Sequence, residues 1–507
     1  MNSRTGTRGR PYPAASRTRQ ETPLHKNLRT ALATATAAAL TGGLLVAMAG
    51  PAAAAPGLDG DFNGDGYRDV AVTAPLANVS GKANAGAVTI LYGSPKGAGA
   101  AKIQTLSQNS AGVPGTAEKD DQFGAHTAPG DFNGDGYADL AVGAPGEDAG
   151  TDTNGGTVVI LWGGSGGLSG GTTVPDPTRS VHDWFGQVVA AGDYDGDGRA
   201  DLAIASDINK VDIYRGGFTK SGSTGGRYTV TAPILKVKGT DIFNLTPGDI
   251  DADGRTDLVV DGYEGDSDGD YSYNANYWLP GSSSGATTSG AQKLPAGVIS
   301  DIGDVDGDGY GDIVIGNSWD PGTDTPGTAK GGSVEIIYGT SYGPEGAAET
   351  VSQNTAGVPG SNETGDNFGY EVSLGDINGD GHDDLVIGAP GEDLGEFKDA
   401  GMVSVIYGWN GGLSETGTQS LHQDIPGVPG GNETGDGFGG EVLLSDVTGD
   451  GKADLTVGLP WENEANGYAV AFNSDGSKID TTGRGIGLTQ AGLSSAGNPM
   501  FGFHING

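Results

Sequence analysis

Short apolar runs recur along the chain from residue 70 to the C-terminal region. Typical runs are Leu140 to Val142 and Leu385 to Ile387, which are rich in aliphatic residues and end at a glycine. A second apolar run follows within each repeat, as at Thr157 to Trp162 or Met402 to Tyr407. Runs of this length, bounded by turn residues, predict buried β-strands. We therefore expect many short strands joined by turns.

Composition supports this expectation. The 507 residues include 96 glycines and 25 prolines, which favour turns over long helices. Hydrophobic residues make up only 35% of the chain, and a low hydrophobic content is one mark of disorder. The regular pattern of apolar runs argues against disorder here. The chain has no cysteine, which excludes disulfides, thiolate metal sites and a cysteine nucleophile.

The first 55 residues differ in kind from the rest. They hold seven Lys and Arg residues against one acid, Glu21, and then an apolar run from about Ala31 to Ala49. Small residues at Ala52 to Ala55 offer a cleavage site. This pattern predicts a signal peptide over residues 1–55 and a secreted, extracellular protein. A membrane anchor is disfavoured because the run is short and interrupted by Gly42 and Gly43.

One nine-residue pattern, D-x-[DNT]-x-D-G-x-x-D, occurs seven times in the chain, at spacings of 55 to 72 residues. A repeat of this length accommodates the four strands of a propeller blade. No glutamate stands at the twelfth position and no helical pattern flanks the pattern, so it differs from an EF-hand. We interpret each copy as an acidic loop between two strands, and we refer to the copies as loops one to seven.

The loops place oxygen-bearing side chains at positions 1, 3 and 5, a glycine at position 6 and an aspartate at position 9. Such oxygen-only sets suit a hard cation, calcium ahead of magnesium, with the backbone carbonyl of position 7 as a further ligand. Up to seven Ca²⁺ are thus predicted, and the candidate metal residues at positions 1, 3, 5, 7 and 9 are Asp61, Asn63, Asp65, Tyr67, Asp69, Asp131, Asn133, Asp135, Tyr137, Asp139, Asp193, Asp195, Asp197, Arg199, Asp201, Asp249, Asp251, Asp253, Arg255, Asp257, Asp304, Asp306, Asp308, Tyr310, Asp312, Asp376, Asn378, Asp380, His382, Asp384, Asp446, Thr448, Asp450, Lys452 and Asp454.

The alternative for any single loop is a solvated turn. Seven copies with an unbroken Asp and Gly skeleton disfavour it, because crowded carboxylates repel one another unless a cation lies among them. Loops three to five carry four carboxylates each, whereas Thr448 in loop seven is neutral and predicts a weaker site. The net charge of −38 disfavours binding to nucleic acids and anionic membranes.

The loops are bracketed by Phe-Gly and Gly-Ala-Pro, as at Phe123-Gly124 and Gly143 to Pro145, and again at Phe368-Gly369 and Gly388 to Pro390. This resembles the FG-GAP repeat of integrin α-chains and of many secreted bacterial proteins. The resemblance implies an all-β, seven-bladed propeller over residues 56–507, with calcium loops on one face and ligand-facing loops chiefly on the other. Phe501-Gly502 has no loop after it, so we expect the C-terminal strand to complete the first repeat.

For function, the sequence favours recognition or adhesion over catalysis. Aromatic side chains stand among acidic ones from residue 263 to 278, in what we interpret as a long inter-strand loop. The candidate ligand-binding residues are Tyr263, Tyr271, Tyr273, Tyr277 and Trp278. The expected ligand is an extracellular protein or a carbohydrate; the alternatives are a calcium-dependent lectin and a secreted hydrolase. We expect a monomer that binds no nucleic acid and, after signal cleavage, no membrane.

We predict no catalytic residue. The patterns at Gly163 to Gly167 and Gly281 to Gly285 match a nucleophile elbow, but that motif needs a strand-to-helix turn and short glycine patterns are frequent here. His126 and His504 stand at matching places in the strand that precedes a loop, as does Glu371. We expect such residues to be packed or to face solvent, and the propeller occupies the length that a separate catalytic domain would need.

Overall fold

The structure is a computed structural model that describes residues 60–507 except 149, 208, 235–241, 266–271, 322–327 and 415. The chain divides into two units, residues 1–53 and 54–507, and the architecture below is that of the second. The predicted signal peptide, 1–55, and the predicted start of the propeller lie outside the described residues. Among those residues, no helix has the length and apolar character needed to span a membrane.

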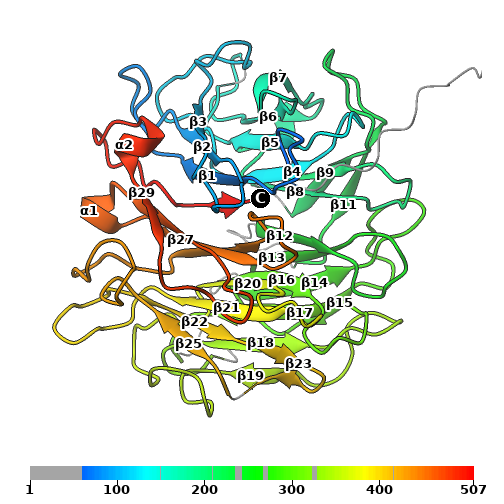
Figure 1. Cartoon of the computed structure of the whole chain (residues 1–507). Coiled ribbons are helices and arrows are strands. Elements are labelled where there is room, and N and C mark those ends of the chain that lie inside the picture. The colour runs from blue at the N-terminus through cyan, green and yellow to red at the C-terminus, as the bar shows by residue number, and fades with distance from the viewer. Residues whose placement is uncertain are drawn as a thin grey trace, which may run out of the picture. The chain divides into compact units, whose positions relative to one another are not determined.

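Within the described ranges the chain forms seven four-stranded antiparallel sheets, which confirms the predicted seven-bladed β-propeller (Figure 1). The innermost strands are β30 (Ile505–Asn506), β4 (Thr127–Gly130), β8 (Val188–Gly192), β12 (Ile242–Gly248), β16 (Ile299–Gly303), β20 (Glu371–Gly375) and β26 (Glu441–Ser445). The second strands are β1 (Val70–Ala74), β5 (Asp139–Ala144), β9 (Asp201–Ala205), β13 (Asp257–Gly265), β17 (Asp312–Asn317), β21 (Asp384–Ala389) and β27 (Asp454–Leu459).

The third strand of each blade is mostly buried, whereas the outermost strand is largely half-buried or exposed. The third strands are β2 (Ala87–Leu91), β6 (Thr157–Trp162), β10 (Lys210–Tyr214), β14 (Ser272–Leu279), β18 (Ser333–Ile337), β22 (Met402–Ile406) and β28 (Tyr468–Phe472). The outermost strands are β3 (Ile103–Leu106), β7 (Ser169–Thr173), β11 (Arg227–Thr231), β15 (Gln292–Leu294), β19 (Glu349–Val351), β25 (Gln419–Leu421) and β29 (Arg484–Ile486).

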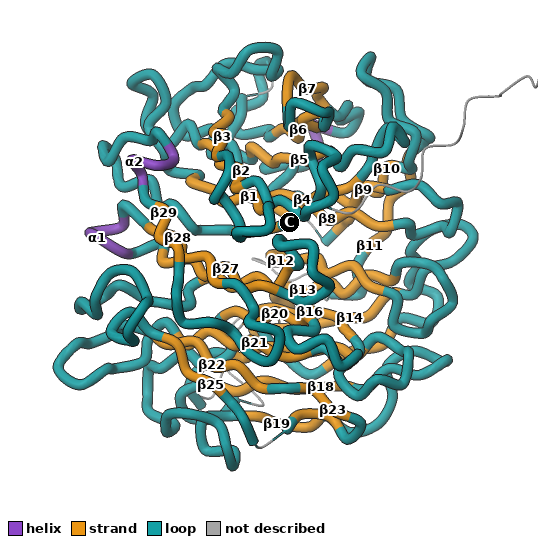
Figure 2. The backbone as a smooth tube through the Cα atoms, in the orientation of Figure 1, coloured by secondary structure: helices purple, strands orange, loops and turns teal. Residues whose placement is uncertain are grey.

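Loops and turns make up most of the remaining described chain (Figure 2). A small hairpin extends the sixth blade, and three short helical segments lie in connections. These elements are β23 (Gly408–Trp409), β24 (Gly412–Leu413), the 3₁₀ turn η1 (Arg179–Val181), α1 (Glu462–Ala465) and α2 (Leu488–Ala491). Long helices are absent from the described part, as expected from its many glycines.

The innermost strands form a closed ring in which β4 contacts β8, each later inner strand contacts the next, and β26 and β4 both contact β30. The last strand of the chain therefore lies in the first blade. Ala71 of β1 pairs with Asn506, and Val72 pairs with Ile505. Because this pairing covers the inner edge of β1, the first sheet has four strands, as the other six sheets do.

The Phe-Gly pairs explain how adjacent blades pack. Phe123, Phe368 and Phe501 are fully buried, and each stands just before an innermost strand. The glycine after each phenylalanine has a left-handed φ, which allows the chain to turn into the strand. Gly502 N donates to Thr73 O as Gly124 N donates to Gly143 O. Phe501 thus holds the same place in the first blade as Phe123 does in the second.

Candidate metal centre

Loops two to seven each join an innermost strand to the second strand of the same blade, and loop one leads into β1, the second strand of the first blade, so all seven lie at one end of the ring. Each loop closes on its first aspartate. Asp61 Oδ1 accepts hydrogen bonds from Gly64 N (2.7 Å) and Asp65 N (3.2 Å), and Oδ2 accepts one from Gly66 N (2.8 Å). In every loop the first aspartate accepts bonds from the amides of positions 5 and 6.

The backbone conformation of the loops explains their glycines. Position 6 is glycine in all seven, with φ between 82° and 91°, a region that L-residues with a side chain avoid. The aspartate at position 5 then accepts a bond from the amide of position 7, as in Asp197 to Arg199 (3.1 Å). The same bond is present in each of the other six loops, at Tyr67, Tyr137, Arg255, Tyr310, His382 and Lys452. The position 7 carbonyl is left for other partners.

The ninth-position aspartate has a role that the sequence pattern alone did not reveal. Its Oδ1 accepts a hydrogen bond from the backbone amide just after the third strand, as when Gly163 N donates to Asp139 (2.8 Å). The donors to the seven aspartates, in blade order, are Gly93, Gly163, Gly216, Gly281, Gly339, Gly408 and Ser474. The aspartate therefore ties the loop to the third strand.

Burial of these aspartates raises their pKa. The pKa rises to about 8 at Asp69 and Asp139, to about 7 at Asp201, Asp312 and Asp384, and to about 6 at Asp257 and Asp454. Desolvation is the largest cause, and the other carboxylates of the same loop raise the pKa further in each case. A cation among the carboxylates would oppose both effects.

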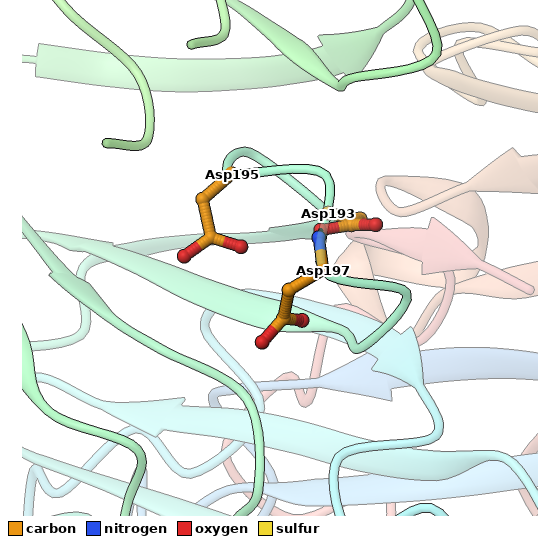
Figure 3. A group of neighbouring side chains, drawn as sticks. All are labelled: Asp193, Asp195 and Asp197. Atoms are coloured by element: carbon orange, nitrogen blue, oxygen red, sulfur yellow. Dashed lines mark hydrogen bonds between the residues drawn. The ribbon is translucent and has the colours of Figure 1, made fainter. Parts of the chain in front are cut away.

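Loop three brings its carboxylates together most clearly. Asp193, Asp195 and Asp197 project from one turn between β8 and β9 (Figure 3), and each offers an oxygen within 4.8 Å of the others. Two further triads meet the same distance limit, Asp249 with Asp251 and Asp257, and Asp304 with Asp306 and Asp308. Loops one, two, six and seven have Asn63, Asn133, Asn378 and Thr448 at the third position, so an amide or hydroxyl replaces one carboxylate there.

Two buried carboxylate oxygens in loop three are suited to ligate a cation. Asp195 Oδ1 and Asp201 Oδ2 are buried and have no hydrogen-bond partner. A buried carboxylate oxygen without a partner costs free energy, which a cation ligated there would offset. The other oxygen of Asp195 forms an ion pair with Arg215, which also donates from Nη2 to Ser284 O (2.7 Å). Arg215 would therefore compete with a bound cation for the Asp195 carboxylate.

Position 7 side chains lie against neighbouring loops. A β-carbon on Gly64 of loop one would lie 2.5 Å from Tyr137 Cε1 of loop two, and Gly307 of loop five is covered in the same way by His382 of loop six. His382 also lies 3.0 Å (Nδ1) from Asp380 Oδ1. These side chains therefore fill the space between neighbouring acidic loops.

The candidate ligand-binding segment requires a correction. Tyr263 lies in β13 and both Tyr277 and Trp278 lie in β14, so the expected long loop is largely a strand pair. Trp278 is buried, and its Nε1 donates to Asp257 Oδ2 (2.9 Å), because it faces the packing side of the blade. Its assignment to an exposed ligand surface is therefore wrong.

Two other members of that segment are partly exposed, and the rest lie outside the description. Tyr263 packs against Phe243 at a ring-centroid distance of 4.8 Å, and Tyr277 lies beneath Lys293 Nζ (5.6 Å to the ring centroid). Tyr271 and the side chain of Tyr273 lie outside the described residues.

Seven four-stranded blades, each with one acidic loop before its second strand, define a β-propeller of repeated units. The comparison with known families agrees. The family described as FG-GAP repeat matches residues 54–91, 123–161 and 368–406, and the family described as FG-GAP-like repeat matches 193–260. The chain contains FG-GAP repeats of the kind found in integrin α-chains, which confirms the resemblance seen in its motifs.

Curated relatives fall into two groups. The chain is 37% identical to the phosphatidylinositol-glycan-specific phospholipase D of Mus musculus over 147 residues, or 29% of this chain and 17% of that protein. It is 31% identical to the Homo sapiens counterpart over 182 residues, 35% and 20% of the two lengths. It is 28% identical to integrin alpha-PS2 of Drosophila melanogaster over 265 residues, 45% and 18% of the two lengths. The matched segments thus span a fifth or less of each relative.

Proposed function

We propose that this protein is a secreted calcium-binding β-propeller that acts as an extracellular recognition or adhesion module. The observation that carries the proposal is the repetition of one acidic loop in every blade, each folded around its first aspartate. Loop three adds the partnerless oxygens of Asp195 and Asp201. Oxygen-rich loops of this kind suit calcium, which accepts variable coordination geometry, better than a small octahedral ion such as magnesium.

Within each loop, we assign the metal-binding role to the side chains at positions 1, 3 and 5 and to the carbonyl at position 7. The ninth aspartate holds the loop against the third strand through one oxygen, and its second oxygen is available in loop three. With the ion bound, mutual repulsion among the carboxylates falls, so the loop becomes a rigid link between strands. Calcium then stabilises each blade as well as its loop.

We assign recognition instead of catalysis because the propeller is built from repeats of one non-catalytic unit. The lipase activity named for some relatives belongs to proteins of which the match covers a fifth or less. A calcium-dependent lectin is the alternative form of the same proposal, and a secreted hydrolase is a weaker one. A glycan array with and without chelator separates a sugar ligand from a protein ligand.

The first test is thermal unfolding with excess calcium and with excess chelator. A ligand that binds only the folded state adds about 2.7 kcal/mol when its concentration is a hundred times Kd. Several such sites should raise the melting temperature markedly. A melting curve that chelator leaves unchanged would contradict the metal assignment and, with it, the proposed calcium-dependent module.

A further inference from the structure

The centre of the ring holds a cavity of about 980 Å³ whose lining comes from all seven blades. Volumes of this order accommodate small organic ligands. Apart from Arg68 of loop one, the acidic loops do not line this cavity; its walls are chiefly the innermost strands. We therefore consider it separately from the proposed calcium sites.

Aromatic side chains surround the cavity at the end opposite the acidic loops. They stand where the innermost strands begin or the second strands end, whereas every acidic loop leads into the start of a second strand, at the other end of the blade. Trp319 is 43% exposed, Phe503 is 42% exposed and Tyr370 is 36% exposed. The collar comprises Phe243, Tyr263, Trp319, Tyr370, Trp461 and Phe503. Large aromatic groups left exposed around an opening are typical of a binding site.

Four acidic side chains line the cavity: Asp301 from β16, Glu371 from β20, Glu441 from β26, and Asp320, which follows β17. Glu371 shares a hydrogen bond with Glu441, and burial together with the Glu441 charge raises the pKa of Glu371 well above its usual range. Burial raises the pKa of Asp301 to about 6, although Leu374 N (2.7 Å) and Ile302 N (2.9 Å) donate to it. The site thus disfavours additional negative charge.

The cationic side chains near these acids are too few to neutralise them, so the net charge of the cavity lining is negative. His504 Nδ1 lies 3.2 Å from Glu441 Oε1, which also accepts a bond from Ile505 N (2.9 Å). His126 stacks on His504 at a centroid distance of 4.1 Å, and burial with the neighbouring His504 lowers the pKa of His126 well below its usual range. His126 is therefore neutral at pH 7, so His504 and Arg68 are the cationic side chains of the lining, against the carboxyl groups of Asp301, Asp320, Glu371 and Glu441.

We propose that the central cavity binds a small organic cation carrying an ammonium group, held between Asp301, Glu371 and Glu441 and covered by the aromatic collar. A positive charge relieves the repulsion between the carboxyl groups, and the ring faces attract it further. A neutral sugar would stack on the collar but leave that repulsion in place. A bare metal ion is disfavoured because, in the described chain, the close acidic triads all belong to the outer loops.

This inference goes beyond the proposed recognition of an extracellular macromolecule, and it does not require calcium in the loops. The test titrates the full-length calcium-loaded protein with butylamine and choline, and in parallel with glucose and inorganic phosphate. Calorimetry and tryptophan fluorescence follow binding, since Trp319 and Trp461 stand in the collar. We expect saturable binding of an ammonium compound and none of phosphate or glucose.

Two matched variants locate the site. Glu371→Gln keeps the size of the side chain and removes its charge, and should weaken ammonium binding about tenfold, as expected for loss of one charge-assisted contact. Glu396→Gln makes the same change at an exposed position outside the cavity and should leave the affinity within about twofold of the wild type, as expected for a screened surface charge. Trp461→Leu should abolish most of the fluorescence change, whereas the exposed Trp409→Leu should not.

Affinity should also rise between pH 6 and pH 8. Asp301, whose pKa is about 6, loses its proton over this change. The charged and titratable groups that share the lining with it are Arg68, Asp320, Glu371, Glu441 and His504, and the charge of Asp383 also raises the pKa of Asp301. A saturable response to glucose alone, no response to either ammonium compound, or equal affinity in Glu371→Gln and wild type would overturn the proposal. A circular dichroism melt of each variant separates loss of the fold from loss of the site. Because the calcium assignment is tested by chelation, the two proposals fail independently.

Discussion

The side chain of Tyr67 packs against Gly449 so closely that a β-carbon on this glycine would lie 2.9 Å from Tyr67 Cδ1. Tyr67 belongs to the first acidic loop and Gly449 to the last, so this contact joins the two ends of the repeat array. Similar contacts link loop one to loop two and loop five to loop six. Where these contacts form, neighbouring acidic loops support one another across the boundary between two blades.

This contact predicts that Gly449→Ala lowers the free energy of unfolding by about 2 kcal/mol, from left-handed strain plus the clash with Tyr67. Gly134→Ala is the matched control, because Gly134 has nearly the same φ (72° against 70°) but no atom within 4 Å of its β-carbon position. It should cost about 1 kcal/mol, the strain alone. Urea unfolding measures both, and equal losses would show that the loop contact contributes nothing.

Arg215 should weaken the third loop's affinity for calcium. Its ion pair with Asp195 must break or rearrange for that carboxylate to ligate an ion. Arg215→Met keeps the apolar stem and removes the charge, so it should tighten calcium binding at this loop, by about threefold for a partly exposed pair worth about 0.6 kcal/mol. Calorimetric titration of the two proteins provides the comparison. Weaker calcium binding by the Arg215→Met variant would contradict the proposed competition between Arg215 and calcium for Asp195.

Outside the acidic loops, Glu392 makes stability depend on pH. Burial raises its pKa to about 7 from an ordinary 4.5, although Gln353 donates to it. The folded state therefore binds this proton more tightly than the unfolded state, so its stabilising contribution is full below pH 4.5 and falls as pH rises to 7. Glu392→Gln should stabilise the protein at pH 8 by about 1 kcal/mol, because water screens a partly buried charge. It should have little effect at pH 4.5.

The comparison uses denaturant unfolding at the two pH values in chelator. Glu396→Gln, an exposed acid in the same connection, serves as the control and should change neither value by more than about 0.5 kcal/mol, as is usual on surfaces. If Glu392→Gln raised the free energy of unfolding equally at both pH values, ionisation of the Glu392 carboxyl group would be excluded as the cause.

Closure through the C-terminus predicts an unusually damaging truncation. Removing residues 499–507 deletes β30 and Phe501, exposes the inner edge of β1 and leaves a hole between the first and last blades. We expect aggregation or loss of cooperative unfolding. Phe501→Ala should alone cost about 3 to 5 kcal/mol, whereas Phe503→Ala, at an exposed position, should cost about 0.5 kcal/mol or less. A monomeric truncated protein with an unaltered melting transition would contradict this account.

The sequence predicts the blades well because their signals are local. Each apolar run and its flanking Phe-Gly or acidic loop occupy a few consecutive residues, so the repeats could be found from their spacing and the propeller predicted from their resemblance to FG-GAP repeats. Trp278 was misjudged because the side of β14 that it faces depends on the register with β13, which composition does not show. The grouping of Glu371 with Glu441 and Asp301 depends on three strands from different blades meeting at the axis. Their proximity is a property of ring closure, and no local pattern encodes it.

The central claim is that the acidic loops bind calcium, and calorimetric titration of calcium into chelator-treated protein tests it most directly. The account predicts saturable binding of up to seven ions per chain. Asp193→Ala should remove a tighter site than Asp446→Ala does, because the last loop has the neutral Thr448 at its third position. If calcium produces no saturable heat, or if Asp446→Ala removes the tightest site, the assignment of the loops is contradicted.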